Sequence, residues 1–155
     1  MRRRLIQAAV VLVVVFAAAQ LVRPDRTNAP TDPARTIRAH VAETSPLPAV
    51  LDRACGDCHS NNTVWPSYAH VAPLSWVMAR AVAQGRRAVN YSEWGGYSPR
   101  QQRTLLAASC DDASTGRMPG GAWTLLHPEA RLSSEDVETI CAAARNGETN
   151  TAQQR

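Results

Sequence analysis

Residues 55–59 contain the residue types, at the spacing, that could attach a reactive cofactor. They read Cys-Gly-Asp-Cys-His, and C-x-x-C-H is the attachment signature of c-type haem. On a turn of helix, cysteines three positions apart lie on one side, where their thiols can add to the two vinyl groups of a porphyrin. The sequence therefore predicts one covalent haem c, with Cys55, Cys58 and His59 as cofactor-binding residues and His59 as an iron ligand.

Two other uses of paired cysteines fit the surrounding sequence less well. A thioredoxin-like redox pair follows a strand in a βαβ unit, and no such pattern precedes Cys55. A structural zinc site needs a second close pair of Cys or His ligands, but Cys110 and Cys141 are far apart in the chain. No carboxylate pair or Ser-His-Asp set is recognisable, so no catalytic residue is predicted and we expect the protein not to be an enzyme.

The iron of a c-type haem commonly takes Met or a second His as its sixth ligand. Met118 lies in Gly-Arg-Met-Pro-Gly-Gly, a loop without helical or strand period in which proline restricts the backbone. Met78 belongs to an apolar helical stripe and is expected in the core. Met118 is therefore the second predicted metal ligand, and His127 is the alternative. A thioether raises the reduction potential and closes the sixth position, which favours electron transfer over catalysis.

The N-terminus has the layout of an export signal. Three arginines precede residues 5–22, a run of 18 residues that is apolar except for two glutamines. This run is just long enough for a transmembrane helix, and Ala17-Ala18-Ala19 could also precede a signal cleavage site. Because the basic residues stay cytoplasmic, we expect residues 1–22 to be a membrane anchor or signal segment. The anchor is favoured, which places the haem domain in the periplasm at the inner membrane. A soluble periplasmic protein after cleavage is the alternative.

The remainder divides into three parts by composition. Residues 23–46 contain four prolines and are predicted to be a Pro-rich extended spacer, with His40 in solvent. Residues 47–146 form the c-type haem-binding domain, and residues 147–155 form a polar C-terminal tail. Without the three N-terminal arginines the net charge falls from +4 to about +1, which leaves no basic patch for nucleic acid.

Helical periodicity and capping residues predict an all-α domain. The four expected helices cover residues 47–58, 72–84, 99–110 and 134–145. Gly85 is expected to end the second helix. Of the other side chains, Arg86, Arg87 or Arg100 could pair with the haem propionates. The tryptophans are expected to line or cover the porphyrin; they are Trp65, Trp76, Trp94 and Trp123.

Beyond C-x-x-C-H, the chain resembles the haem-binding domain family, whose members are small single-haem relatives of cytochrome c. The matching stretches are CGDCHSNNTVWPSY (55–68), VAPLSW (71–76), GRRAVNYSEW (85–94), RMP (117–119) and LHPEARLS (126–133). They span roughly residues 48–145 in register, and the Trp-Pro, Ser-Trp and Met-Pro blocks are more specific than C-x-x-C-H alone. The resemblance implies a cytochrome c-like helical fold around one haem, with His59 and Met118 as the axial ligands.

The chain departs from this family at two cysteines. The last helix of the family usually carries Trp near the position of Cys141, and Cys110 is not part of the usual pattern. In an oxidising compartment, the two together suggest a disulfide between the third and fourth helices. Two buried free thiols are the alternative.

These expectations combine into a periplasmic, membrane-tethered monohaem cytochrome with His/Met-ligated iron. It would carry electrons between redox partner proteins in the periplasm or inner membrane, with contact to the membrane through the N-terminal helix and none to nucleic acid. The alternative is a haem-based sensor or small-ligand-binding protein in which Met118 leaves the iron when a ligand arrives.

Overall fold

The computed structural model describes residues 1–146, and every regular element among them is helical. The α-helices are α1 (Arg2–Ala19), α2 (Leu47–Ala54), α3 (Gly56–His59), α4 (Leu74–Ala88), α5 (Pro99–Ser114), α6 (Gly121–Leu126) and α7 (Ser134–Asn146). Five 3-10 turns connect them: η1 (Pro33–Arg35), η2 (Ile37–His40), η3 (Ser67–His70), η4 (Tyr91–Gly96) and η5 (Pro128–Ala130). The all-α fold class is confirmed, and the predicted tail over 147–155 lies outside the described residues.

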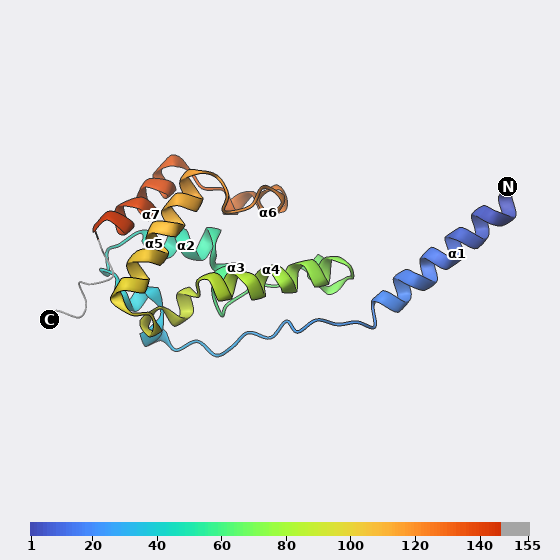
Figure 1. Ribbon diagram of the computed structural model, residues 1–155, viewed down its shortest axis with the longest axis horizontal. Helices are drawn as coiled ribbons and strands as arrows, with labels where there is room; N and C mark the ends of the chain where they lie inside the picture. The colour runs from blue at the N-terminus through green and yellow to red at the C-terminus, as the bar shows by residue number, and fades with distance from the viewer. Residues whose placement is uncertain (147–155) are drawn as a thin grey trace.

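The hydrophobic core lies where α2, α5 and α7 meet η4. Figure 1 shows α5 and α7 side by side next to α2, with α3 and α4 below them. The largest fully buried side chains are Trp94, Leu47, Leu51, Leu106 and Ile140. Burial of such a side chain contributes about 1.5–3 kcal/mol. This cluster therefore fixes how the helix before the C-x-x-C-H motif sits against the last helix.

A disulfide between Cys110 and Cys141 joins α5 to α7, with 4.8 Å between the two Cα atoms. The disulfide suggested by the two additional cysteines is thus confirmed. It closes a loop with a sequence separation of 31 residues, which stabilises the fold by about 3–4 kcal/mol in the chain-entropy model. Because these two sulfurs bond each other, they are unavailable as ligands for a structural zinc ion.

The helix starts lie within two residues of the predicted ones, whereas three helix ends differ; the helix predicted over 99–110, for example, continues to Ser114. Ser98 and Gln101 form a capping box at the start of α5, and Pro99 is its first residue. The helix expected over 47–58 is interrupted at Cys55, where φ is −123° and ψ is −24°. The second predicted helix continues through Gly85 to Ala88. Gly85 is therefore inside the helix and is not its cap. It makes a close packing contact there, which is described below.

The N-terminal helix α1 ends at Ala19, three residues before the end of the apolar run at Val22. The side chain of its C-cap residue Gln20 contacts the segment before α4, where its Oε1 accepts from Ala72 N–H at 2.9 Å. Figure 1 shows α1 projecting away from the rest of the molecule. Within residues 1–146, no helix is both long enough and apolar enough to cross a membrane. The predicted transmembrane helix over 5–22 is therefore not supported.

The segment predicted to be a spacer is extended but lies along the domain, and we call residues 20–38 the N-terminal strap. Its carbonyls and side chains bond the segment that follows His59, for example Asn28 Nδ2 to Thr63 O at 3.0 Å. Farther on, Ile37 is 3% exposed and belongs to the core cluster. His40 is not in solvent either, since its Nε2 is buried without a hydrogen-bond partner. The folded unit therefore begins well before residue 47.

Arg86 is the main link between the strap and the domain. Its guanidinium donates to Ser60 O at 2.7 Å, Thr27 O at 3.2 Å, Asn28 Oδ1 at 2.7 Å and Thr63 Oγ1 at 2.9 Å. One cationic side chain thus holds together the strap, the end of α3 and α4.

Replacing Arg86 with Ala should lower the free energy of unfolding by about 2–3 kcal/mol, because four acceptors lose a charged donor. Arg87→Ala is the matched control, since Arg87 is exposed on the same helix and makes no hydrogen bond or ion pair within the described residues. Urea unfolding followed by circular dichroism measures both variants. Equal midpoints for the two variants would show that residues 20–38 are only a spacer.

Candidate functional site

The C-x-x-C-H motif forms a tight turn between α2 and α3. The N–H groups of Cys58 and His59 both donate to the carbonyl of Cys55, at 3.1 and 2.9 Å. Both cysteines are free and half-buried. The turn is fixed by Asp57, whose Oδ1 accepts from Val64 N–H at 2.8 Å. The motif is therefore held by backbone hydrogen bonds without any cross-link between its two thiols.

Burial makes both thiols weak acids. It raises the pKa of Cys55 to about 12, and together with the Asp57 carboxylate it raises the pKa of Cys58 to about 11. An apolar setting disfavours a thiolate but not a neutral sulfur. This environment suits a thioether, which carries no charge at any pH.

Backbone carbonyls at the end of α4 orient the His59 imidazole. Its Nδ1 lies 3.2 Å from Val89 O, and a carbonyl only accepts, so Nδ1 carries the proton. Burial lowers the pKa of His59, although the carbonyls of Val89 and Gly85 and the Asp112 carboxylate oppose that shift. The ring is thus neutral at neutral pH, and Nε2 keeps a lone pair that no hydrogen bond uses within the described residues. A metal-ligating histidine is commonly oriented in this way.

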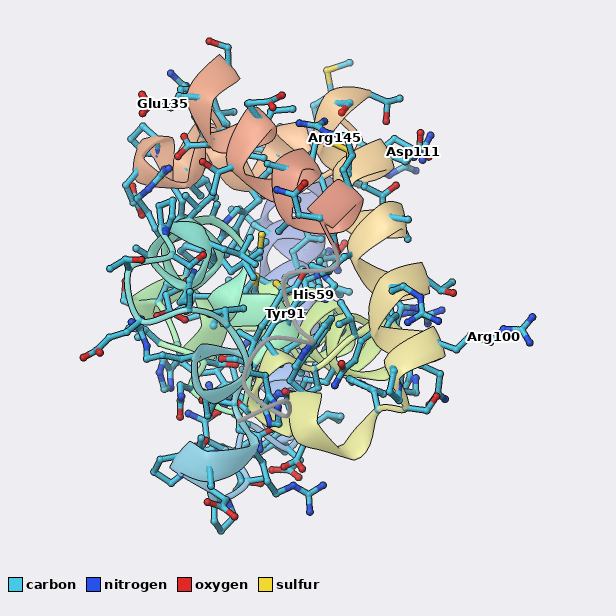
Figure 2. All side chains as sticks on the ribbon, turned by 90° about the vertical axis from the view of Figure 1, so that its left-hand side faces the viewer. His59, Tyr91, Arg100, Asp111, Glu135 and Arg145 are labelled. Carbon is cyan, nitrogen blue, oxygen red and sulfur yellow. A yellow bond between two sulfur atoms is a disulfide. The ribbon has the colours of Figure 1, made fainter. Side chains whose placement is uncertain are left out.

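Tyr91 packs beside His59, with 6.1 Å between the ring centroids, and its hydroxyl bonds Ser109 on α5 at 3.0 Å. Figure 2 shows the two labelled rings together inside the domain. Tyr91 therefore links the histidine side of the site to α5, a contact that the sequence did not predict.

Met118 lies in the loop that follows the C-terminal end of α5. Its N–H donates to Asp112 O at 3.2 Å, and the neighbouring Arg117 pairs with Asp111 and, at 2.7 Å, with Asp112. The Asp112 carboxylate, which opposes the lowering of the His59 pKa, is thus on the same helix end from which the Met118 loop leaves. The Met118 side chain is 50% exposed, so its thioether is accessible to a cofactor.

The two other ligand candidates are engaged elsewhere. Both ring nitrogens of His127 have partners, Nε2 with Tyr68 Oη at 2.7 Å and Nδ1 with Glu129 Oε1 at 3.1 Å. Met78 is 7% exposed on the packed face of α4, as its apolar stripe indicated. Of the candidates named from sequence, Met118 is thus the one whose donor atom is free.

The tryptophans do not share one role. Trp94 is fully buried in the core, and Trp76 Nε1 donates to the strap at Val22 O, 2.8 Å away. Trp123 stacks on His127 with 3.7 Å between centroids. The Nε1 atoms of Trp65 and Trp94 are both buried without a hydrogen-bond partner; Trp94 is in the core, whereas Trp65 is only partly buried.

The three arginines considered for the propionates also differ. Arg86 is committed to the strap, and Figure 2 shows Arg100 pointing away from the domain. Arg87 is exposed. The structure therefore favours neither Arg86 nor Arg100 for this role.

These residues fit a haem group. Two neutral, half-buried thiols and an imidazole with a free Nε2 form the donor set that a covalently attached haem requires. The unpartnered Trp65 N–H is a donor available to a carboxylate such as a propionate. Three large apolar side chains of the domain are exposed; they are Val64 at 75%, Leu125 at 73% and Leu126 at 61%.

Residues 14–146 match the haem-binding domain family. The chain belongs to this family, and it is a haem-binding protein. No significant match is found among curated proteins or among solved structures.

The contact between Gly85 and the motif should be sensitive to a single methyl group. A Cβ at this position would lie 2.3 Å from the carbonyl oxygen and 2.9 Å from the carbonyl carbon of Cys58, so α4 must move away from the motif. Gly85→Ala should lower the free energy of unfolding by about 1–3 kcal/mol and reduce the fraction of protein that carries haem. Both are measured on purified protein, by denaturant titration and by the Soret-to-protein absorbance ratio.

Gly121→Ala is the matched control, since a Cβ there has nothing within 4 Å and alanine favours a helix. Normal haem content in Gly85→Ala would mean that this contact does not shape the site.

Proposed function

We propose that the protein is a monohaem c-type cytochrome that carries electrons outside the cytoplasm, with iron ligated by His59 and Met118. The observation that carries the proposal is the His59 imidazole, whose Nδ1 lies 3.2 Å from Val89 O and whose Nε2 has no hydrogen-bond partner within the described residues, directly beside two unpaired thiols. Bound haem supplies a one-electron couple at its iron. The residues of the chain attach the group, orient its ligands and exclude water.

Each residue of the site has a distinct role in the proposed cytochrome. Cys55 and Cys58 form the two thioethers, and His59 donates Nε2 to the iron. Met118 donates a soft sulfur, which favours the reduced iron and raises the reduction potential relative to two histidines. A haem held by His59 and Met118 would leave no iron position open for a substrate, which supports a carrier over an enzyme.

The N-terminal segment supports the proposed location. Residues 2–4 are basic and the following residues of α1 are apolar and exposed, which is the pattern of an export signal. We place the haem domain in the periplasm, attached to the inner membrane through the N-terminal segment. Its partners are redox proteins there, and none of these contacts involves nucleic acid.

A haem-based sensor is the second candidate. It is favoured by one observation: the Met118 side chain is half exposed, and its loop is tied to α5 by surface ion pairs, which contribute little in water. Carbon monoxide added to the reduced protein separates the two functions, because only a labile Met118 permits rapid binding.

Export should be required for haem attachment. In a host that matures c-type cytochromes, the full chain should carry pigment that survives denaturation and acid-acetone extraction. Deleting residues 2–19, which leaves Gln20 and the strap in place, should reduce this pigment to background. A cleavable secretory signal in place of residues 2–19 should restore it, and membrane fractionation should find only the full chain in the membrane.

The three results separate the parts of the proposal. A colourless full chain contradicts covalent haem, pigment in the deletion variant contradicts export, and a full chain in the soluble fraction contradicts the tether alone.

Met118→Ala should abolish the charge-transfer band from sulfur to ferric iron and lower the reduction potential, because the soft ligand is lost. Met78→Leu is the matched control; it preserves the volume of a buried methionine and should keep both properties. Absorption spectroscopy and potentiometry measure the two variants. Retention of the band in Met118→Ala would transfer the sixth ligand to another residue.

A further inference from the structure

Four side chains outside the haem attachment site form one hydrogen-bonded and stacked cluster. His127 is at its centre, with Tyr68 Oη 2.7 Å from Nε2 and Glu129 Oε1 3.1 Å from Nδ1. The Trp123 indole stacks on the imidazole with an interplanar angle of 12°. The His127 side chain is 17% exposed, so the imidazole is enclosed from three sides.

The direction of these hydrogen bonds follows from the acceptor on Nδ1. The ionised carboxylate of Glu129 accepts only, so Nδ1 of His127 carries a proton, and in the neutral imidazole Nε2 then presents a lone pair. The Tyr68 hydroxyl therefore donates to Nε2. We call this Tyr68–His127 hydrogen bond the clasp.

The clasp joins two segments that begin at the two proposed axial ligands. The first runs from His59 through the Trp-Pro block to Tyr68 in η3, and the second runs from Met118 through α6 to His127. The second segment has little other support, because α6 contains no buried residue. Its far end is held at η5, where Arg53 on α2 donates to Arg131 O at 3.0 Å.

We infer that the clasp holds the 118–127 segment against the histidine side of the site, and so limits how often Met118 leaves the iron. The inference rests on the proposed haem site. Without the clasp, the interactions that hold the Met118 loop within residues 1–146 are its contacts to the end of α5 and those at η5. An intact clasp keeps Met118 on the iron, which favours electron transfer. Loss of the clasp would let Met118 leave the iron more often, which favours binding of an external ligand.

Tyr68→Phe removes the donor and keeps the ring. Loss of one hydrogen bond should raise the apparent affinity of the reduced protein for carbon monoxide by about fivefold, because Met118 is displaced more often. Tyr97→Phe is the matched control: it removes another tyrosine hydroxyl, which accepts from Asn90 N–H at 3.0 Å but touches neither segment. Affinities of Tyr68→Phe equal to those of wild type and Tyr97→Phe would overturn the inference.

A second readout does not depend on ligand binding. Amide hydrogen exchange over residues 121–127 should become faster in Tyr68→Phe and His127→Ala, and should stay near wild type in Tyr97→Phe. His127→Gln keeps an acceptor within reach of Tyr68 and should restore part of the protection. Because the two residues act as a pair, the double variant Tyr68→Phe/His127→Ala should exchange no faster than His127→Ala alone. Additive effects would contradict a direct clasp.

The failure of the proposed function looks different. If Met118→Ala keeps the sulfur-to-iron band, the ligand assignment is wrong, whereas unchanged exchange in Tyr68→Phe means that the clasp does not hold α6.

Discussion

The contact between the C-terminal end of α4 and the C-x-x-C-H turn is the constraint on which the site depends. Three residues of α4 and its exit meet that turn. Gly85 lies against the Cys58 carbonyl, where no Cβ can fit, Arg86 donates to Ser60 O, and Val89 O receives Nδ1 of His59. The backbone of α4 must come this close for Val89 to reach the imidazole, and glycine alone permits that approach. The free Nε2 of His59 is therefore a consequence of helix packing.

The opposite side of the site is built in another way. The Met118 loop leaves the end of α5, and the position of α5 is set by the Cys110–Cys141 disulfide to α7 and by core packing. The disulfide thus acts on the site at a distance, since it fixes the helix end that carries Asp112. The cross-link stabilises the fold because it restricts the unfolded chain. Because it joins α5 to α7, it also fixes the position of α5 in the folded protein.

Local signals predicted the local structure well. The Ser98 capping box, the start of α7 and the helical stripe of Met78 all act within a few residues, so the sequence displays them directly. The sequence did not predict contacts between distant segments. Gly85 is a residue type that often ends a helix, but its role depends on a contact with Cys58. The proline-rich residues 23–46 likewise do not indicate that Arg86 binds them. Tyr68 and His127 are both in family-like blocks, yet nothing in either block indicates that they pair. The ligand roles of Cys55, Cys58, His59 and Met118 remain predictions that this geometry supports.

The two sides of the site differ in how firmly they hold a ligand. The His59 ring is mostly buried, bonded to a carbonyl and packed on Tyr91, so its orientation is fixed before any cofactor binds. Met118 is half exposed, and the pairs from Arg117 to Asp111 and Asp112 are on the surface, where such pairs are weak. Any loosening of the site must therefore begin on the methionine side. The distinction between carrier and sensor then depends less on which residues bind iron than on what restrains residues 118–127. Within the described residues, the interactions available for that are the contacts to α5, the anchoring of η5 by Arg53 and the hydrogen bond between Tyr68 and His127.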